Sequence, residues 1–177
     1  KGLRMNDYLF VLKYRLPPDL EVGAAVERLG AAGCTDALIG IGIAGRLALE
    51  FDRTASNALD AITSAIKDVL DALPCAELIE VGPDLVGLSD IADFVAVSRQ
   101  NIRKLMVGNP SAPLPVHDGT TTLWPLAEVL DWLFAEKDYP LQPVLRETAL
   151  AARSVNMDHL RLRHDALKRV DLQRAVG

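Results

Sequence analysis

The stretch that decides the fold of this chain is LSDIADFVAVSRQNIRKLM, residues 88–106. Its apolar spacing predicts two short helices joined by a tight turn. Ser89 and Ser98 are the expected caps of these helices, because a serine hydroxyl can accept a hydrogen bond from a free backbone N–H group at a helix start. The residues expected to point inward are Ile91, Ala92, Val95, Val97, Ile102, Leu105 and Met106.

The outward side of the second helix is polar and contains no acid. It consists of Arg99, Gln100, Asn101, Arg103 and Lys104. Arginine can bind guanine edges, asparagine and glutamine can bind adenine edges, and lysine can hold a phosphate. This combination therefore indicates a surface that binds DNA.

The stretch resembles a DNA-binding helix-turn-helix, and the run Ser98–Leu105 is typical of its MerR, excisionase and AlpA-like branch. The resemblance implies that Ser98–Met106 is a recognition helix for the major groove of double-stranded DNA. Most members have glycine at the turn, where the backbone φ is positive. This chain has Ala96, which we expect to cost roughly 1 kcal/mol there. The alternative is two ordinary surface helices of a larger helical domain.

The segment after the second helix predicts a small hairpin and another helix. Residues 116–124 form the expected hairpin around Asp118 and Gly119, and Pro125 starts the helix. The expected apolar side of that helix is Leu126, Val129, Leu130, Leu133 and Phe134, joined by Trp132. By resemblance, the hairpin corresponds to the wing of AlpA and excisionase proteins. Its tip carries hydroxyls that can bind phosphate or sugar, on Thr120, Thr121 and Thr122.

The N-terminal half alternates strand and helix patterns in the order β-α-β-β-α-β. The expected strands are residues 8–16, 36–43, 46–51 and 77–81, and the expected helices begin at Asp19 and at Thr54 or Ser56. This order is the ferredoxin-like arrangement, an antiparallel sheet with two helices on one face, and it resembles ACT-type regulatory modules. The other face of such a sheet needs a cover, so we predict a homodimer.

The C-terminal tail is expected to be helical. Pro143 opens one helix, and Asn156 or Asp158 caps a second that carries cations at Arg161, Arg163, Lys168, Arg169 and Arg174. Three interpretations remain open: an arm that binds a partner or a second subunit, a contact to the DNA backbone, or a helix folded onto the core. We favour the arm.

The charge of the chain restricts the DNA-binding interpretation. The net charge of the 177 residues is −5, and residues 1–86 carry 8 cations and 13 acids, whereas residues 141–177 carry 7 cations and 4 acids. A DNA-binding function therefore requires a local cationic surface.

Several classes of function find no support in the sequence. No nucleophile elbow, zinc-protease pair or nucleotide loop is present, so we expect no enzyme, no cofactor and no metal site. The glycine-rich residues 40–45 lie in a predicted hairpin and not between a strand and a helix, which argues against a phosphate loop. Cys34 and Cys75 are read as two reduced, partly buried thiols, and with no membrane span or signal peptide we expect a cytoplasmic protein.

The sequence thus predicts an α+β chain with three parts: a ferredoxin-like domain over residues 1–84, a winged helix-turn-helix over 85–139 and a helical tail over 140–177. The expected function is sequence-specific binding of double-stranded DNA as a homodimer, with Ser98 and Thr120–Thr122 beside the helix residues named above. One alternative is a protein-interaction subunit, such as an antitoxin, that binds partners through its C-terminal helices. Another is a small-ligand sensor that uses the N-terminal domain.

Overall fold

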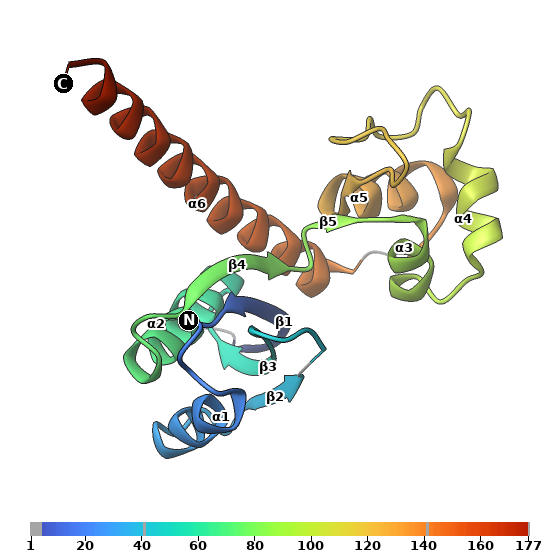
Figure 1. Ribbon diagram of the computed structural model, residues 1–177. Coiled ribbons are helices and arrows are strands. Elements are labelled where there is room, and N and C mark those ends of the chain that lie inside the picture. Colours follow the sequence, from blue (N-terminus) through green and yellow to red (C-terminus); the bar gives the residue numbers. More distant parts are fainter. Residues whose placement is uncertain (1–4, 41, 141, 177) are drawn as a thin grey trace.

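The computed structural model describes residues 5–40, 42–140 and 142–176, with side chains up to residue 169. It is an α+β structure in which the described residues form a four-stranded antiparallel sheet, a two-stranded sheet and six helices (Figure 1). Buried apolar side chains form two separate clusters, and a long C-terminal helix contacts both of them.

The N-terminal part has the element order that the sequence predicts. The elements are β1 (Asn6–Arg15), α1 (Val22–Ala31), β2 (Ala37–Gly40), β3 (Arg46–Ala55), α2 (Ala58–Ala72) and β4 (Glu77–Gly82). The strands lie in the order β2-β3-β1-β4, and every neighbouring pair is antiparallel. The first and last strands of this part, β1 and β4, are therefore neighbours in the sheet.

Alternation along β1 gives the sheet a buried face and an open face. Tyr8, Phe10, Leu12 and Tyr14 are buried in the first core, under the helices, whereas Leu9 between them is 60% exposed. This is the period of two that a strand imposes on its side chains. We call the open side the outer face of the sheet; it includes Leu9, Val11, Leu38, Glu50 and Asp52.

The second core belongs to residues 85–137. Strand β5 (Leu85–Val86) pairs antiparallel with β6 (Trp124–Pro125), and between them lie α3 (Leu88–Phe94) and α4 (Arg99–Met106). Helix α5 (Leu126–Lys137) follows directly and buries Leu126, Val129, Leu130, Trp132 and Leu133. Phe134 was predicted on this buried side, which is wrong: it lies one turn after Leu130, toward the C-terminal end of α5, and its side chain is 50% exposed.

The tail is one helix, α6 (Pro143–Val176), where the sequence predicts two. Asn156 does not cap a second helix. Its side-chain amide instead binds the backbone of Val81 in β4, accepting from the N–H at 2.8 Å and donating to the carbonyl at 2.8 Å. The helix continues through this position because the amide has a partner in another element.

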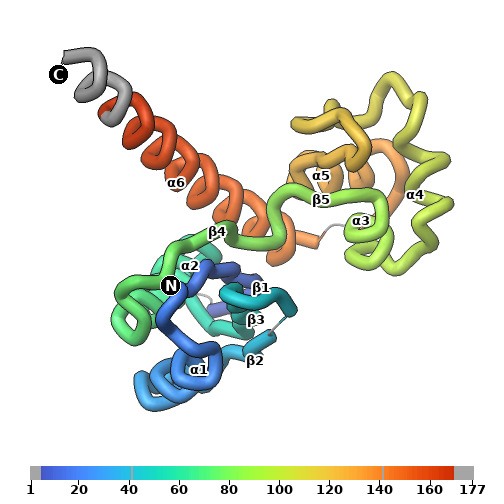
Figure 2. Tube along the Cα trace, in the orientation of Figure 1, coloured from blue at the N-terminus to red at the C-terminus, as the bar shows by residue number. Residues whose placement is uncertain are grey.

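Helix α6 joins the two cores and then leaves them. Ala152 is buried in the first core and Ala149 in the second. After Asn156 the helix still lies beside β4, where His159 and Arg163 border a hollow together with Glu77, and its later turns project from the molecule (Figures 1 and 2). Among the described helices, none combines the length and apolar character that a bilayer crossing requires.

Candidate nucleic-acid interface

Helix α3 begins two residues earlier than the predicted cap at Ser89 implies. It starts at Leu88, and its N-cap is Gly87, whose backbone N–H donates to the Asp90 carboxylate at 2.8 Å. The predicted cap at Ser89 is therefore wrong, because Ser89 already lies inside the helix. The spacing of Asp90, an acid three residues after the cap, is the signal that identifies the true start.

The turn between α3 and α4 has the backbone that the helix-turn-helix resemblance implies. Ala96 adopts a φ of +54°. The N–H of Val97 returns to the carbonyl of Ala92 at 3.0 Å, which closes the turn. Ala92 is 2% exposed, and its small side chain lies where the two helices meet in the second core. The helices therefore pack closely although the turn lacks glycine.

Helix α4 is capped and anchored as predicted. The Ser98 hydroxyl accepts from the Asn101 N–H at 3.2 Å, and this confirms Ser98 as the N-cap. Ile102 is fully buried and Met106 is 4% exposed, with Leu105 partly buried beside them. One side of the helix is thus fixed in the core, and the opposite side is set by the helical period.

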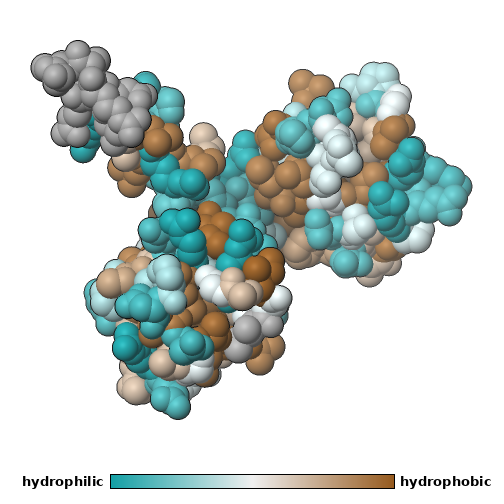
Figure 3. All heavy atoms as spheres, in the orientation of Figure 1, coloured by the Kyte–Doolittle hydropathy of each residue, from teal (hydrophilic) through white to brown (hydrophobic). Residues whose placement is uncertain are grey.

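The outward residues of α4 are all exposed. They are Arg99, Gln100, Asn101, Arg103 and Lys104, and Ser98 is exposed at their N-terminal end. Within the described part of the chain, no carboxylate forms an ion pair with the three cations of this helix. Figure 3 shows hydrophilic atoms gathered over α4 at the right-hand edge of the molecule. This surface is open and cationic in a chain that is anionic as a whole.

The hairpin predicted after α4 is present in a minimal form. His117 and Leu123 form a single antiparallel bridge, with the Leu123 N–H donating to the His117 carbonyl at 2.9 Å. Gly119 lies against the His117 imidazole, since a Cβ built on this glycine would be 2.7 Å from Nε2. Thr120 and Thr121 are exposed at the tip, and Thr122 is half-buried.

Two contacts fix this hairpin and α4 onto the same core. The Leu126 N–H donates to the Asp84 carbonyl at 2.8 Å, next to the β5–β6 pair, so the segments before α3 and after the hairpin are joined. The Trp132 indole N–H donates to the Ser111 hydroxyl at 3.1 Å and ties the loop after α4 to α5. The sequence does not reveal the second contact, because a loop serine has no distinguishing pattern.

The described residues give little indication of a metal site or of a reactive cysteine. Among the described residues, no group of histidine, cysteine and acidic side chains is placed to hold a metal ion. Cys34 is buried, and burial raises the pKa of its thiol, with Asp68 and Asp36 raising it further. Cys75 is exposed, so the expectation that both thiols are partly buried is wrong for this residue. Neither thiol adjoins α4.

Comparison with family models, curated proteins and solved structures finds no significant match to this chain. The functional interpretation therefore depends on the geometry described above.

Proposed function

We propose that this chain is a sequence-specific DNA-binding regulator that inserts α4 into the major groove. The observation that carries the proposal is the two-sided character of α4: Ile102 and Met106 fix it in the core, and its opposite side exposes three cations and two carboxamides without an acid. A helix of this kind after a tight turn is the element that helix-turn-helix proteins place in the groove.

Each exposed residue has a proposed role. Arg99, Gln100, Asn101 and Arg103 contact base edges, where their donors and acceptors distinguish guanine from adenine. Lys104 and Ser98 bind the phosphate backbone, together with the hairpin hydroxyls of Thr120–Thr122. Residues 85–139 are then a winged helix-turn-helix, and the positive φ of Ala96 supports this assignment.

The N-terminal part is proposed to be a ferredoxin-like domain that contributes to a homodimer. The strand order β2-β3-β1-β4 with antiparallel neighbours supports the ferredoxin-like assignment. In a twofold dimer the two α4 helices would enter successive major grooves, about 34 Å apart, and the binding site would be partly palindromic.

The test begins with selection of bound sequences from a random DNA pool. The full chain is expected to enrich one partly palindromic motif. A variant with Arg99, Arg103 and Lys104 all changed to Ala should bind that motif at least about 30-fold more weakly, since each lost base contact costs about 1–3 kcal/mol. A matched control changes Arg28 and Lys67, two exposed cations of the N-terminal part, to Ala. Failure to enrich any motif, or equal loss in the control, contradicts the proposal.

A second candidate function is a protein-interaction subunit, such as an antitoxin. The exposed apolar side chains on the projecting half of α6 favour it, because Leu160 and Leu167 are 58% and 66% exposed. Retention on DNA that falls with rising salt separates the two functions: a regulator shows it, whereas a subunit that binds only protein does not.

A further inference from the structure

The projecting half of α6 carries an apolar stripe that is exposed in the part of the chain that the structure describes. We call residues 157–169 the arm. Met157, Leu160 and Leu167 are between 58% and 66% exposed, and their spacings of three and seven residues place them on one side of the helix. The earlier turns of the same helix are anchored in the two cores, and burial of the exposed apolar side chains of the arm against another surface would be favourable.

Charges around the stripe argue against pairing with the same stripe of another chain. Arg161 and Lys168 flank the stripe on one side and Arg163 flanks it on the other. The acids of the arm, Asp158 and Asp165, lie away from the stripe, and Asp158 forms an exposed ion pair of 3.4 Å with Arg161. Two arms packed stripe to stripe would bring like charges together, which destabilises a coiled coil. The stripe instead fits an apolar surface bordered by carboxylates.

The outer face of the sheet is such a surface. Leu9 is 60% and Leu38 is 72% exposed. The strand register places Leu9 opposite Asp52 and Leu38 opposite Glu50, so two carboxylates lie directly beside the two leucines. Both carboxylates are exposed, and within the described residues neither forms an ion pair. The helices of the N-terminal part cover the opposite face of the sheet, so this face is open to a further layer.

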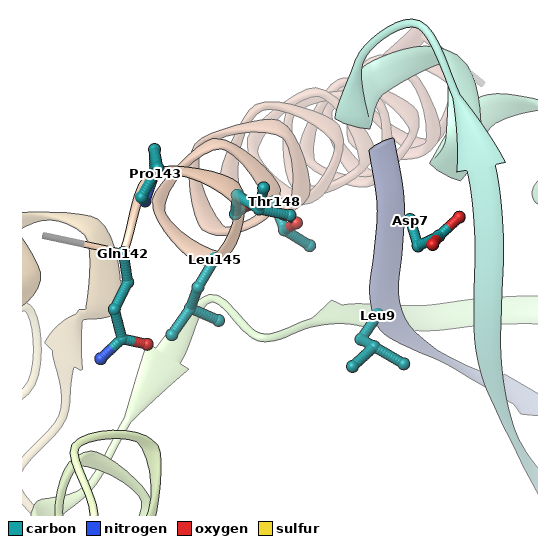
Figure 4. Close-up of a pocket in the computed structure, with 7 residues that line it drawn as sticks. Asp7, Leu9, Gln142, Pro143, Leu145 and Thr148 are labelled. Carbon is teal, nitrogen blue, oxygen red and sulfur yellow. Dashed lines mark hydrogen bonds between the residues drawn. The ribbon is translucent and has the colours of Figure 1, made fainter. Parts of the chain in front are cut away.

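The surface around Leu9 is also hollowed. A hollow of about 320 Å³ lies between β1 and the first turns of α6, lined by Asp7, Leu9, Leu145 and Thr148 among others. Figure 4 shows Leu9 from β1 and Leu145 from α6 bordering this space. A second hollow lies between Leu9 and Leu38 and includes Glu50 and Asp52. These depressions offer places for leucine side chains of an approaching helix.

We infer that the outer face binds the arm of a second copy of this chain, with Leu160 and Leu167 against Leu9 and Leu38, and with Arg161 and Lys168 near Glu50 and Asp52. The thirteen residues of the arm are about 20 Å long at 1.5 Å per residue. Four strands are about 15–20 Å wide, so the lengths match. A reciprocal exchange of arms closes into a twofold dimer. This inference does not depend on DNA binding.

The first test measures the mass of the full chain in solution by light scattering, without DNA. The parent is expected at twice the chain mass of 19.2 kDa. Leu160→Glu with Leu167→Glu, and separately Leu9→Glu with Leu38→Glu, should each reduce the mass to that of one chain. Leu162→Glu is the matched control, because Leu162 is 64% exposed on the other side of the arm, and it should remain a dimer.

The second test exchanges the charges. Arg161→Glu with Lys168→Glu, and Glu50→Lys with Asp52→Lys, should each weaken the dimer, and the chain that carries all four changes should dimerise again. Circular dichroism of every variant verifies that the helices are retained. A monomeric parent overturns the inference. So does a dimer that tolerates every sheet variant, which would indicate pairing of arms. Loss of DNA binding does not affect either measurement, so this inference stands if the DNA-binding proposal fails. A monomeric parent would overturn this inference and the proposed homodimer, whereas DNA binding through α4 would still be tested by the selection from a random pool.

Discussion

Ala96 is one of two non-glycine residues with a positive φ in the described part of the chain, and the other, Asp138, is of a type that tolerates this region better than alanine. The φ of +54° at Ala96 lies in the left-handed region, which costs an L-residue roughly 1–2 kcal/mol and costs glycine much less. Ala96→Gly should therefore raise the free energy of unfolding by about 0.5–1 kcal/mol, after the greater unfolded-state entropy of glycine is subtracted. Urea denaturation measures this change.

A branched side chain at the same position should have the opposite effect. Ala96→Val should destabilise the chain by more than about 1 kcal/mol, because a β-branched residue rarely adopts a positive φ. Ala112→Gly, in the loop after α4, is the control for the general effect of adding glycine. Stabilisation of both glycine variants alike would show that the turn backbone is not the cause.

Removal of Arg99 and removal of Lys104 are predicted to change DNA binding in different ways. Arg99→Ala should weaken binding to the selected motif by about 1–3 kcal/mol and relax the preference at one base position. Lys104→Ala should weaken binding to all sequences uniformly and reduce the salt dependence by about one phosphate contact per chain. Fluorescence anisotropy with single-base variants of the motif distinguishes these results. Identical profiles for both variants would contradict the assignment of base and backbone roles.

At the scale of elements, Asn156 joins α6 to the edge of the sheet. Its amide forms two hydrogen bonds of 2.8 Å with Val81 and donates a third of 2.8 Å to Asp84, a carboxylate that is 8% exposed. Asn156→Ala leaves these groups with fewer partners, and we expect a loss of about 2–3 kcal/mol in the free energy of unfolding. Thermal and urea denaturation measure it.

An exposed residue farther along α6 is the control for this element. Leu162→Ala removes a larger side chain that is 64% exposed and lies off the apolar stripe, and its effect should be within about 0.5 kcal/mol. Equal losses in both variants would indicate that the contact with Val81 is not the cause of the effect at Asn156, because alanine itself favours the helix.

The comparison of these elements explains what the sequence can predict. Helices α3 and α4 were predicted because their caps and apolar spacing lie within a few residues of each other, and Ser98 does cap α4. The boundary in the tail was wrong because Asn156 resembles a cap locally, whereas its partner Val81 is 75 residues away. The exposure of Phe134 likewise depends on what packs beside α5. The base-contacting role of α4 remains a prediction.

At the scale of the whole molecule, the net charge differs from one part of the chain to another. The N-terminal part and the segment that contains α4 are both anionic in total, whereas the three cations of α4 are exposed and form no ion pair among the described residues. Repulsion between the acidic regions and phosphate would discourage contact elsewhere on the surface, so that a nucleic acid would be directed to α4.

The position of α6 between the two clusters affects how the chain unfolds. Ala149 and Ala152 are one turn apart on this helix, yet each helps to enclose a different cluster of buried side chains. Unfolding of either cluster would remove the helix that covers the other cluster. Calorimetry should therefore record a single heat-absorption peak for the chain. Two resolved peaks would mean that α6 does not couple the unfolding of the two clusters.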